Sequence, residues 1–210
     1  MLHSRRQALR LSAGFLLACR DARTGKDASA PPPSASPIVT PSCVETHDNI
    51  EGPYYRANAP ERANLLEPGM LGTPIEIRGR VTGLDCAARA PGLANVELDV
   101  WHATHDGHYD NDGTMRLGDR FLLRGRVRTD AEGRYAIRTI MPGRYLNGRQ
   151  YRPAHVHVKL RAAGFAPLTT QLYFPGDPYN DVDPFIHRSL IMSVESAVAR
   201  FDFVLRPAAG

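Results

Sequence analysis

The sequence predicts an all-β protein, a β-sandwich of mostly antiparallel strands joined by long loops. Short segments alternate between apolar and polar residues, and 18 Gly and 17 Pro supply abundant turn residues. No helical period persists for more than a turn or two. Hydrophobic residues make up 42% of the 210 residues, and the mean hydropathy is -0.33. This composition supports one folded core and excludes a polytopic membrane protein.

Seven segments have the alternation typical of half-buried strands. Residues 75–82 read Ile-Glu-Ile-Arg-Gly-Arg-Val-Thr, and the other six segments are residues 96–101, 121–127, 135–140, 155–160, 169–174 and 201–205. The intervening Asp130-Ala-Glu-Gly133 predicts a hairpin turn, because Gly tolerates a positive φ. A short helix is expected only at residues 61–66.

Residues 1–18 have the composition of an export signal. Arg5 and Arg6 precede a short apolar run, residues 11–18, whereas a membrane span needs about 20 residues. The paired arginines resemble a twin-arginine signal, and Leu16-Leu17-Ala18-Cys19 resembles a bacterial lipobox. We therefore expect an exported protein, periplasmic or anchored to the cell-envelope membrane through acylated Cys19. An ordinary cleaved signal, in which Cys19 is incidental, stays the alternative.

The rest of the chain divides into a tether and a domain. Residues 19–42 contain Pro31-Pro32-Pro33 among Ala and Ser, a composition typical of a disordered tether. The folded domain is expected at residues 43–207. The formal charge is +4, and Arg5, Arg6 and Arg10 account for three of these charges in a segment without acids, which leaves 4 − 3 = +1 for the remainder. The charge therefore does not favour a nucleic-acid partner.

Two cysteines remain after the lipobox, Cys43 and Cys86. An even pair in an exported domain favours a disulfide, which in the chain-entropy model stabilises a loop of this size by roughly 4 kcal/mol. Two free buried thiols are the alternative.

His155 and His157 are the first candidates for chemistry. On a strand, residues two apart point to the same side, with Cα atoms about 7 Å apart. The pair is thus able to converge on a metal ion. Two hydrogen-bonded structural histidines are an equally good interpretation of the pair alone.

Tyr109 and Tyr145 narrow the choice of metal. A phenolate is a hard anionic oxygen ligand, and its pKa near 10 has to be lowered by a strong Lewis acid. Ferric iron does this better than zinc or ferrous iron. Considered singly, each tyrosine is more often a packing residue.

Six motifs occur in an order that resembles the intradiol ring-cleavage dioxygenases. They are Glu51-Gly-Pro-Tyr-Tyr55, Asn95 to Trp101 with Tyr109 eight residues later, Asp130-Ala-Glu-Gly-Arg-Tyr135, Thr139-Ile-Met-Pro-Gly143, Arg152-Pro-Ala-His-Val-His157 and Gln171-Leu-Tyr-Phe-Pro-Gly-Asp177. The likeness is strongest to the protocatechuate 3,4-dioxygenase-type core and its exported relatives, because a helical N-terminal dimerisation segment is lacking. This likeness is compatible with a homo-oligomer.

The resemblance implies non-haem Fe(III) held by Tyr109, Tyr145, His155 and His157, with Tyr145 as the displaceable ligand. It implies that both atoms of O2 enter a catechol between its two hydroxylated carbons, giving a cis,cis-muconate-type diacid. Arg152 would stabilise charge on the substrate ring, and Gln171 would hydrogen-bond to Arg152 or to an oxygen intermediate. Without the resemblance, Arg152 reads as a surface ion-pair residue and Gln171 as a sheet-edge amide.

Other polar residues receive weaker assignments. Tyr54 and Tyr55 line the pocket or only pack, and Tyr173 is expected to be structural. His102, His105 and His108 do not share one face of an extended segment, so they are expected behind the ligands or in solvent.

A non-catalytic, membrane-tethered β-sandwich that binds aromatic ligands is the alternative function, since a fold alone does not establish catalysis.

Overall fold

The computed structural model describes residues 44–84 and 90–209. The predicted export signal, the tether, Cys19 and the Cys43–Cys86 bridge lie outside these ranges and stay predictions. Within the described ranges the one helical element is the 3₁₀ turn η1 (Arg188–Leu190), and no helix there is long and apolar enough to cross a membrane. The all-β prediction is confirmed.

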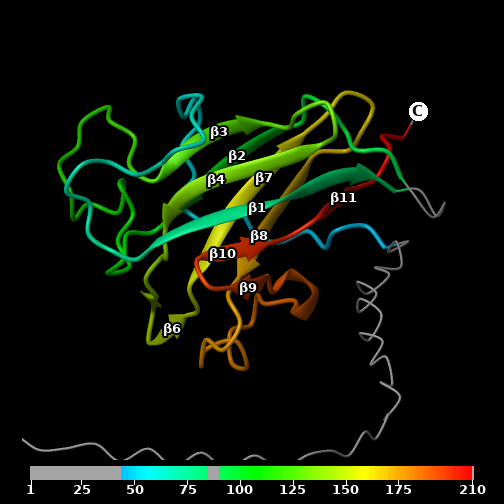
Figure 1. Cartoon of the computed structure of the whole chain (residues 1–210). Helices are drawn as coiled ribbons and strands as arrows, with labels where there is room; N and C mark the ends of the chain where they lie inside the picture. The colour runs from blue at the N-terminus through cyan, green and yellow to red at the C-terminus, as the bar shows by residue number, and fades with distance from the viewer. Residues whose placement is uncertain (1–43, 85–89, 210) are drawn as a thin grey trace, which may run out of the picture. The chain divides into compact units, whose positions relative to one another are not determined.

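The strands form two larger sheets and one hairpin. The first sheet has the order β11-β1-β10-β9, with β4 also paired to β1; its strands are β1 (Pro74–Gly83), β4 (Arg134–Ile140), β9 (Ser193–Glu195), β10 (Val198–Arg200) and β11 (Phe203–Leu205). The second has the order β3-β2-β7-β8, with β2 (Glu97–His102), β3 (Arg124–Arg128), β7 (His155–Arg161) and β8 (Leu168–Tyr173). Strands β5 (Tyr145–Asn147) and β6 (Gln150–Arg152) make the hairpin. Figure 1 shows the sheet of β1 and β4 lying across the sheet of β2 and β7.

The core fills the space between the two sheets. Ile75 and Ile77 of β1 belong to the same buried cluster as Val156, Val158 and Leu160 of β7. Each such side chain contributes about 1.5–3 kcal/mol when it leaves water. Since alternate residues of β7 enter this core, the residues between them are directed to the opposite face of the second sheet.

The strand predicted at residues 201–205 is shorter, because β11 begins at Phe203. Strands β10 and β11 pair with β1 in the same parallel register, and the ladder is interrupted at Phe201 and Asp202 between them, where Arg80 N–H donates to the Asp202 carboxylate at 2.8 Å. A Cβ atom on Gly79 would stand 1.7 Å from the Phe201 carbonyl oxygen. Only glycine therefore allows the backbones to approach here.

Two local predictions were wrong. The Asp130–Gly133 turn forms, with Gly133 at φ 78°, but it joins β3 of one sheet to β4 of the other and makes no hairpin. Residues 61–66 form no helix, because Glu61 and Asn64 instead make isolated parallel bridges to Arg126 and Arg138.

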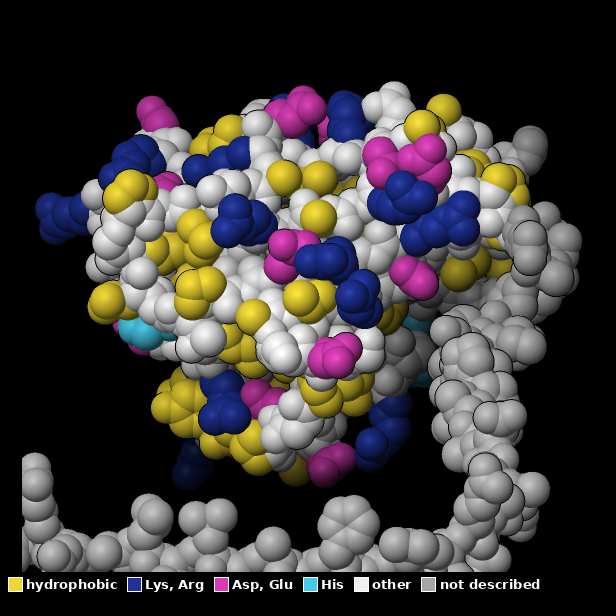
Figure 2. Space-filling view, viewed as in Figure 1, with side chains coloured by type: hydrophobic (Ala, Val, Ile, Leu, Met, Phe, Trp, Pro, Cys, Tyr) yellow, Lys and Arg dark blue, Asp and Glu magenta, His cyan; other side chains and the backbone are white. Residues whose placement is uncertain are grey.

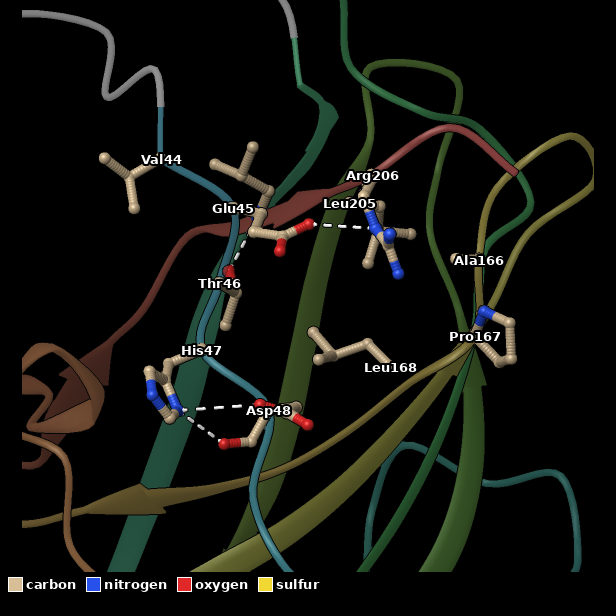
Figure 3. A pocket seen from close by; sticks show the side chains of 11 residues that line it. Val44, Glu45, Thr46, His47, Asp48, Ala166, Pro167, Leu168, Leu205 and Arg206 are labelled. Atoms are coloured by element: carbon tan, nitrogen blue, oxygen red, sulfur yellow. Dashed lines mark hydrogen bonds and ion pairs between the residues drawn. The ribbon is translucent and has the colours of Figure 1, made fainter. Parts of the chain in front are cut away.

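Charged side chains of both signs are interspersed over the face seen in Figure 2. A pocket of about 440 Å³ opens beside β11, where the Glu45 carboxylate pairs with Arg206 Nε at 3.2 Å (Figure 3). It is lined by residues 44–48, 166–168 and 204–206. None of the four predicted metal ligands is among them, so this pocket is separate from the chemistry that the sequence indicates.

Candidate active site

The candidate site is built on the outer face of the second sheet. His157 of β7 pairs with Trp101 of β2 on one side and with Gln171 of β8 on the other. Two pairs further along, His155 lies opposite Tyr173. Directly opposed residues in antiparallel strands share a face, so strand register alone gathers these five side chains. All five are at least 98% buried.

The two histidines are neutral and oriented. His155 Nδ1 lies 2.6 Å from the Pro153 carbonyl oxygen, which only accepts, so Nδ1 carries the proton and Nε2 presents a lone pair. The His157 ring stacks on Trp101 with centroids 4.7 Å apart. Burial, followed by the charge of Arg152, lowers the pKa of His155 to about 3. Burial, followed by His155, lowers the pKa of His157 well below its usual value. Neutral imidazoles are the form that binds metals.

Two loops bring the tyrosines over this pair. Tyr109 lies in the loop after β2, and Tyr145 begins β5. The Tyr109 and Tyr145 rings meet edge to face at 5.7 Å, and each lies near a histidine, with 5.6 Å between the Tyr145 and His155 centroids and 6.2 Å between those of Tyr109 and His157. The predicted four side chains therefore converge.

Close backbone packing holds the two loops together. Gly143 N–H donates to the Thr104 carbonyl at 2.8 Å. At Gly107, where φ is +89°, a Cβ atom would stand 2.2 Å from the Arg144 carbonyl oxygen. This contact ties the Tyr109 loop to the residue that precedes Tyr145, and a side chain at Gly107 would separate them.

The two tyrosines differ in exposure. Tyr109 is 1% exposed, and its hydroxyl is buried without a hydrogen-bond partner. Burial, reinforced by Tyr145, raises the pKa of Tyr109, so that it stays a neutral phenol unless a strong cation is present. Tyr145 is only half-buried. The Tyr109 oxygen is thus enclosed by protein, whereas the Tyr145 side chain is accessible to solvent.

Arg152 reaches into the site from β6 and is 3% exposed, so the surface ion-pair interpretation is wrong. Its Nη1 lies 3.4 Å from Tyr145 Oη and 3.5 Å from His155 Nε2, while Nη2 donates to Gln171 Oε1 at 2.8 Å. Burial alone would lower the pKa of Arg152, but the hydrogen bonds to Asp183 and Tyr145 raise it above its usual value. Arg152 is therefore a fixed cation facing Tyr145 and His155.

Gln171 and Tyr173 complete the network around Arg152. Gln171 lies on the edge strand β8, but it is fully buried and donates to the Ile50 carbonyl at 2.7 Å, so it is not an exposed sheet-edge amide. The Tyr173 hydroxyl accepts from Arg152 Nη2 at 3.1 Å and donates to Gln171 Oε1 at 2.9 Å. Tyr173 thus belongs to the site network, although the sequence places it among the structural tyrosines.

The segment before β1 covers the site. A Cβ atom on Gly52 would stand 3.3 Å from His157 Cε1, so this backbone passes directly over the ring. Tyr54 stacks on Tyr109 at 4.4 Å, and the Tyr55 hydroxyl donates to Asp99 at 2.9 Å. The Glu51-Gly-Pro-Tyr-Tyr55 motif therefore both lines the site and packs against its aromatic residues.

The other histidines of the Tyr109 loop do not join the cluster. His102 is 2% exposed and spans the two sheets, with Nε2 2.6 Å from Thr139 Oγ1 of β4. Burial lowers its pKa to about 4. His105 and His108 are partly exposed and lie near Asp106 and Asp112. Of the three, His102 has a structural role that its spacing did not reveal.

The donor atoms fit a hard trivalent metal ion. In the part of the chain that the structure describes, no three His, Cys, Asp or Glu side chains are placed to hold a metal, so a metal bound by the two histidines would need tyrosine oxygens as further ligands. Two neutral imidazoles and two phenols offer such a set, and the Tyr109 oxygen lacks any other partner.

Comparison with known proteins identifies the family. A family model described as Dioxygenase matches residues 50–207. A chlorocatechol 1,2-dioxygenase from Pseudomonas sp. (strain P51) is 39% identical over 150 residues, which are 64% of this chain and 57% of the relative. The chain belongs to the intradiol ring-cleavage dioxygenase family.

Solved structures agree with this membership. The dioxygenase domain of a dioxygenase and carbohydrate-binding protein fusion from Streptomyces sp. SirexAA-E matches with a TM-score of 0.67 and 40% identity, over 79% of this chain and 100% of that one. Catechol 1,2-dioxygenase from Pseudomonas arvilla C-1 matches with a TM-score of 0.67 and 31% identity, over 78% of this chain and 62% of that one. The chain spans a little over half the length of the first curated intradiol relative.

Sequence reasoning missed several residues of this candidate site. Asp183 bonds to Arg152 Nε at 2.8 Å, and neither spacing nor motif pointed to it. Tyr173 was findable, because it is two residues from Gln171 on one strand and so shares its face. Asp110 and Arg124, a buried ion pair beside Tyr109, were not anticipated either.

Proposed function

We propose that this protein is a non-haem ferric dioxygenase that cleaves catechol-type rings between the two hydroxylated carbons and incorporates both atoms of O2. The observation that carries the proposal is the convergence of two tyrosines and two histidines beside a buried arginine. Family membership supports it, and relatives named as catechol and chlorocatechol 1,2-dioxygenases indicate the substrate class.

Tyr109, Tyr145, His155 and His157 would hold the iron. When bound, ferric iron withdraws electron density from a catecholate and makes its ring reactive toward O2. Tyr109 would be the permanent anionic ligand, because its buried oxygen has no alternative partner. Tyr145 is half-buried, so its Oη atom, as a phenolate when iron is bound, would be the one that takes a proton from the entering catechol and becomes a phenol.

Arg152 and Gln171 supply fixed polar groups beside the reacting ring. Arg152 Nη2 is held by Gln171 and Nε by Asp183, which directs Nη1 toward Tyr145. A cation fixed in a buried site stabilises negative charge that develops on the ring without having to reorganise. Gln171 is held in turn by the Ile50 carbonyl, so the network is set before substrate arrives.

Oxygen uptake by iron-loaded protein tests the proposal. With a panel of catechol, chlorocatechols, hydroxyquinol and protocatechuate, at least one substrate is expected to consume one O2 per ring and to yield a muconate-type diacid. With ¹⁸O2 the product should carry two ¹⁸O atoms, one in each new carboxyl group, while its other two oxygens come from the catechol hydroxyls. Tight binding of catechols to iron-loaded protein without uptake would instead support the non-catalytic binding module.

We propose further that the protein is exported and anchored through acylated Cys19, on the strength of the lipobox-like Leu16-Leu17-Ala18-Cys19. Acyl chains contribute about 0.8 kcal/mol for each buried CH₂. Cys19→Ser protein is expected to move from the membrane fraction to the soluble fraction in a bacterial host. The mature wild-type protein should begin at Cys19 and carry the mass of the acyl groups. A membrane fraction that is unchanged by Cys19→Ser would contradict the anchor.

A further inference from the structure

The residue after Tyr109 is part of a buried charge cluster that the proposed chemistry does not use. Asp110 Oδ1 accepts from Arg124 Nε at 2.7 Å and from Nη2 at 2.5 Å, and Oδ2 accepts from Arg56 Nη1 at 2.9 Å. The side chains of Asp110 and Arg124 are 0% and 2% exposed, and that of Arg56 is 22% exposed. Charges are rarely buried to this extent unless they are paired.

The cluster lies in the same row as the candidate ligands. Arg124 of β3 pairs directly with Trp101 of β2, and Trp101 pairs with His157 of β7. Opposed residues share a face, so Arg124 is directed to the same face of the sheet as His157, one strand beyond Trp101. The row places the arginine beside the Trp101 and Tyr109 cluster that forms the floor of the site.

The cluster has one more positive charge than negative. Two arginines share one aspartate, and Arg124 Nη1 is buried without a hydrogen-bond partner. Tyr109 is one residue along the chain, so this surplus charge lies close to a candidate iron ligand. Its field acts most strongly where water is excluded, because the local dielectric is low there.

Backbone contacts make the cluster a rigid support. Asp110 Oδ2 also accepts from Leu122 N–H at 3.2 Å, and Arg124 Nη2 donates to Asn111 Oδ1 at 2.9 Å. These bonds tie the middle of the long loop after β2 to its C-terminal end and to the start of β3. Tyr109 N–H is held separately by Asp112 Oδ2 at 2.9 Å.

We propose that Asp110, Arg124 and Arg56 form a charge clamp that positions Tyr109 as an iron ligand. The inference rests on the proposed function, in which Tyr109 binds iron. The three residues are positioning residues, since they act through Tyr109 and the substrate does not touch them.

The test uses the phenolate-to-iron charge-transfer band in a Tyr145→Phe background, where Tyr109 is the sole phenolate ligand. Light moves negative charge from the phenolate to the metal, so a nearby cation raises the transition energy. Arg124→Met is expected to shift the band to longer wavelength and to weaken iron binding about 10- to 100-fold. Arg56→Gln should shift it in the same direction by less, and it keeps the Asp110–Arg124 pair that supports folding.

Arg128→Met is the matched control. Arg128 lies on β3 like Arg124, but it is 42% exposed and pairs with Glu97. In the Tyr145→Phe background, the charge-transfer band and the iron affinity of the Arg128→Met protein should equal those of the Tyr145→Phe protein itself. Unshifted bands in folded, iron-loaded Arg56→Gln and Arg124→Met proteins overturn the clamp and leave the proposed function intact. If Arg124→Met does not fold, Arg56→Gln decides. If the Tyr145→Phe protein forms no coloured ferric complex, the assignment of Tyr109 as an iron ligand is itself overturned.

Discussion

Tyr109→Phe protein is expected to purify without bound iron, without colour and without ring-cleaving activity. Loss of an outer hydrogen-bond partner of a metal ligand typically costs about 10- to 100-fold in affinity, and loss of an anionic ligand costs more. Tyr109 is 1% exposed and enclosed by Tyr54, Trp101 and Tyr145, so solvent water has little access to replace its oxygen. Iron content by elemental analysis and the visible spectrum measure the effect.

Tyr135→Phe is the control for loss of a buried hydroxyl. Tyr135 is 5% exposed and donates to the Phe201 carbonyl at 2.8 Å, in the first sheet. Its removal should lower the free energy of unfolding by about 1 kcal/mol and leave iron and colour unchanged. Full iron occupancy in Tyr109→Phe protein would show that the buried oxygen is not a ligand.

Arg152→Lys is expected to keep iron and colour but to lower kcat by about 10²- to 10³-fold, the usual cost of losing one fixed electrostatic donor. Lysine retains the positive charge but cannot bond to Gln171, Tyr173 and Asp183 at once. The charge would therefore no longer be held beside Tyr145. Oxygen uptake and iron content, measured on the same preparation, separate catalysis from metal retention.

Arg161→Lys is the matched control for Arg152→Lys. Arg161 ends β7, the strand that carries both histidines, but its side chain is 45% exposed and pairs with Glu97 at 3.1 Å. An exposed pair of this kind contributes little, so kcat should stay close to the wild-type value. A kcat for Arg152→Lys within a few-fold of wild type would rule out an electrostatic role for Arg152.

Much of the fold was predictable from local patterns. The alternating segments around Ile77, Leu98, Ile137 and Val156 became β1, β2, β4 and β7, because one buried face is enough to specify a strand. The short strands β5, β6, β9 and β10 were missed, since three residues are too few to show a period. The helix expected at residues 61–66 was wrong because bridges to two different sheets override local propensity.

The candidate ligands were predictable because their residue types are chemically distinctive. His155 and His157 share a strand face by simple alternation, and Tyr109 and Tyr145 stand in motifs that resemble the family's. Asp183 was not predictable, because its role is to neutralise and orient Arg152 from a loop 31 residues away in sequence. A lone aspartate carries no local signal of such a partner.

The sequence by itself determined the kinds of donor atom, the half-buried strands and the family. Tertiary structure alone decided which faces meet, because register between distant strands is set by packing and by hydrogen bonds that no local pattern encodes. That register puts Arg124, Trp101, His157 and Gln171 in one row. It also leaves the Tyr109 oxygen buried without a partner, the feature that a cation would satisfy.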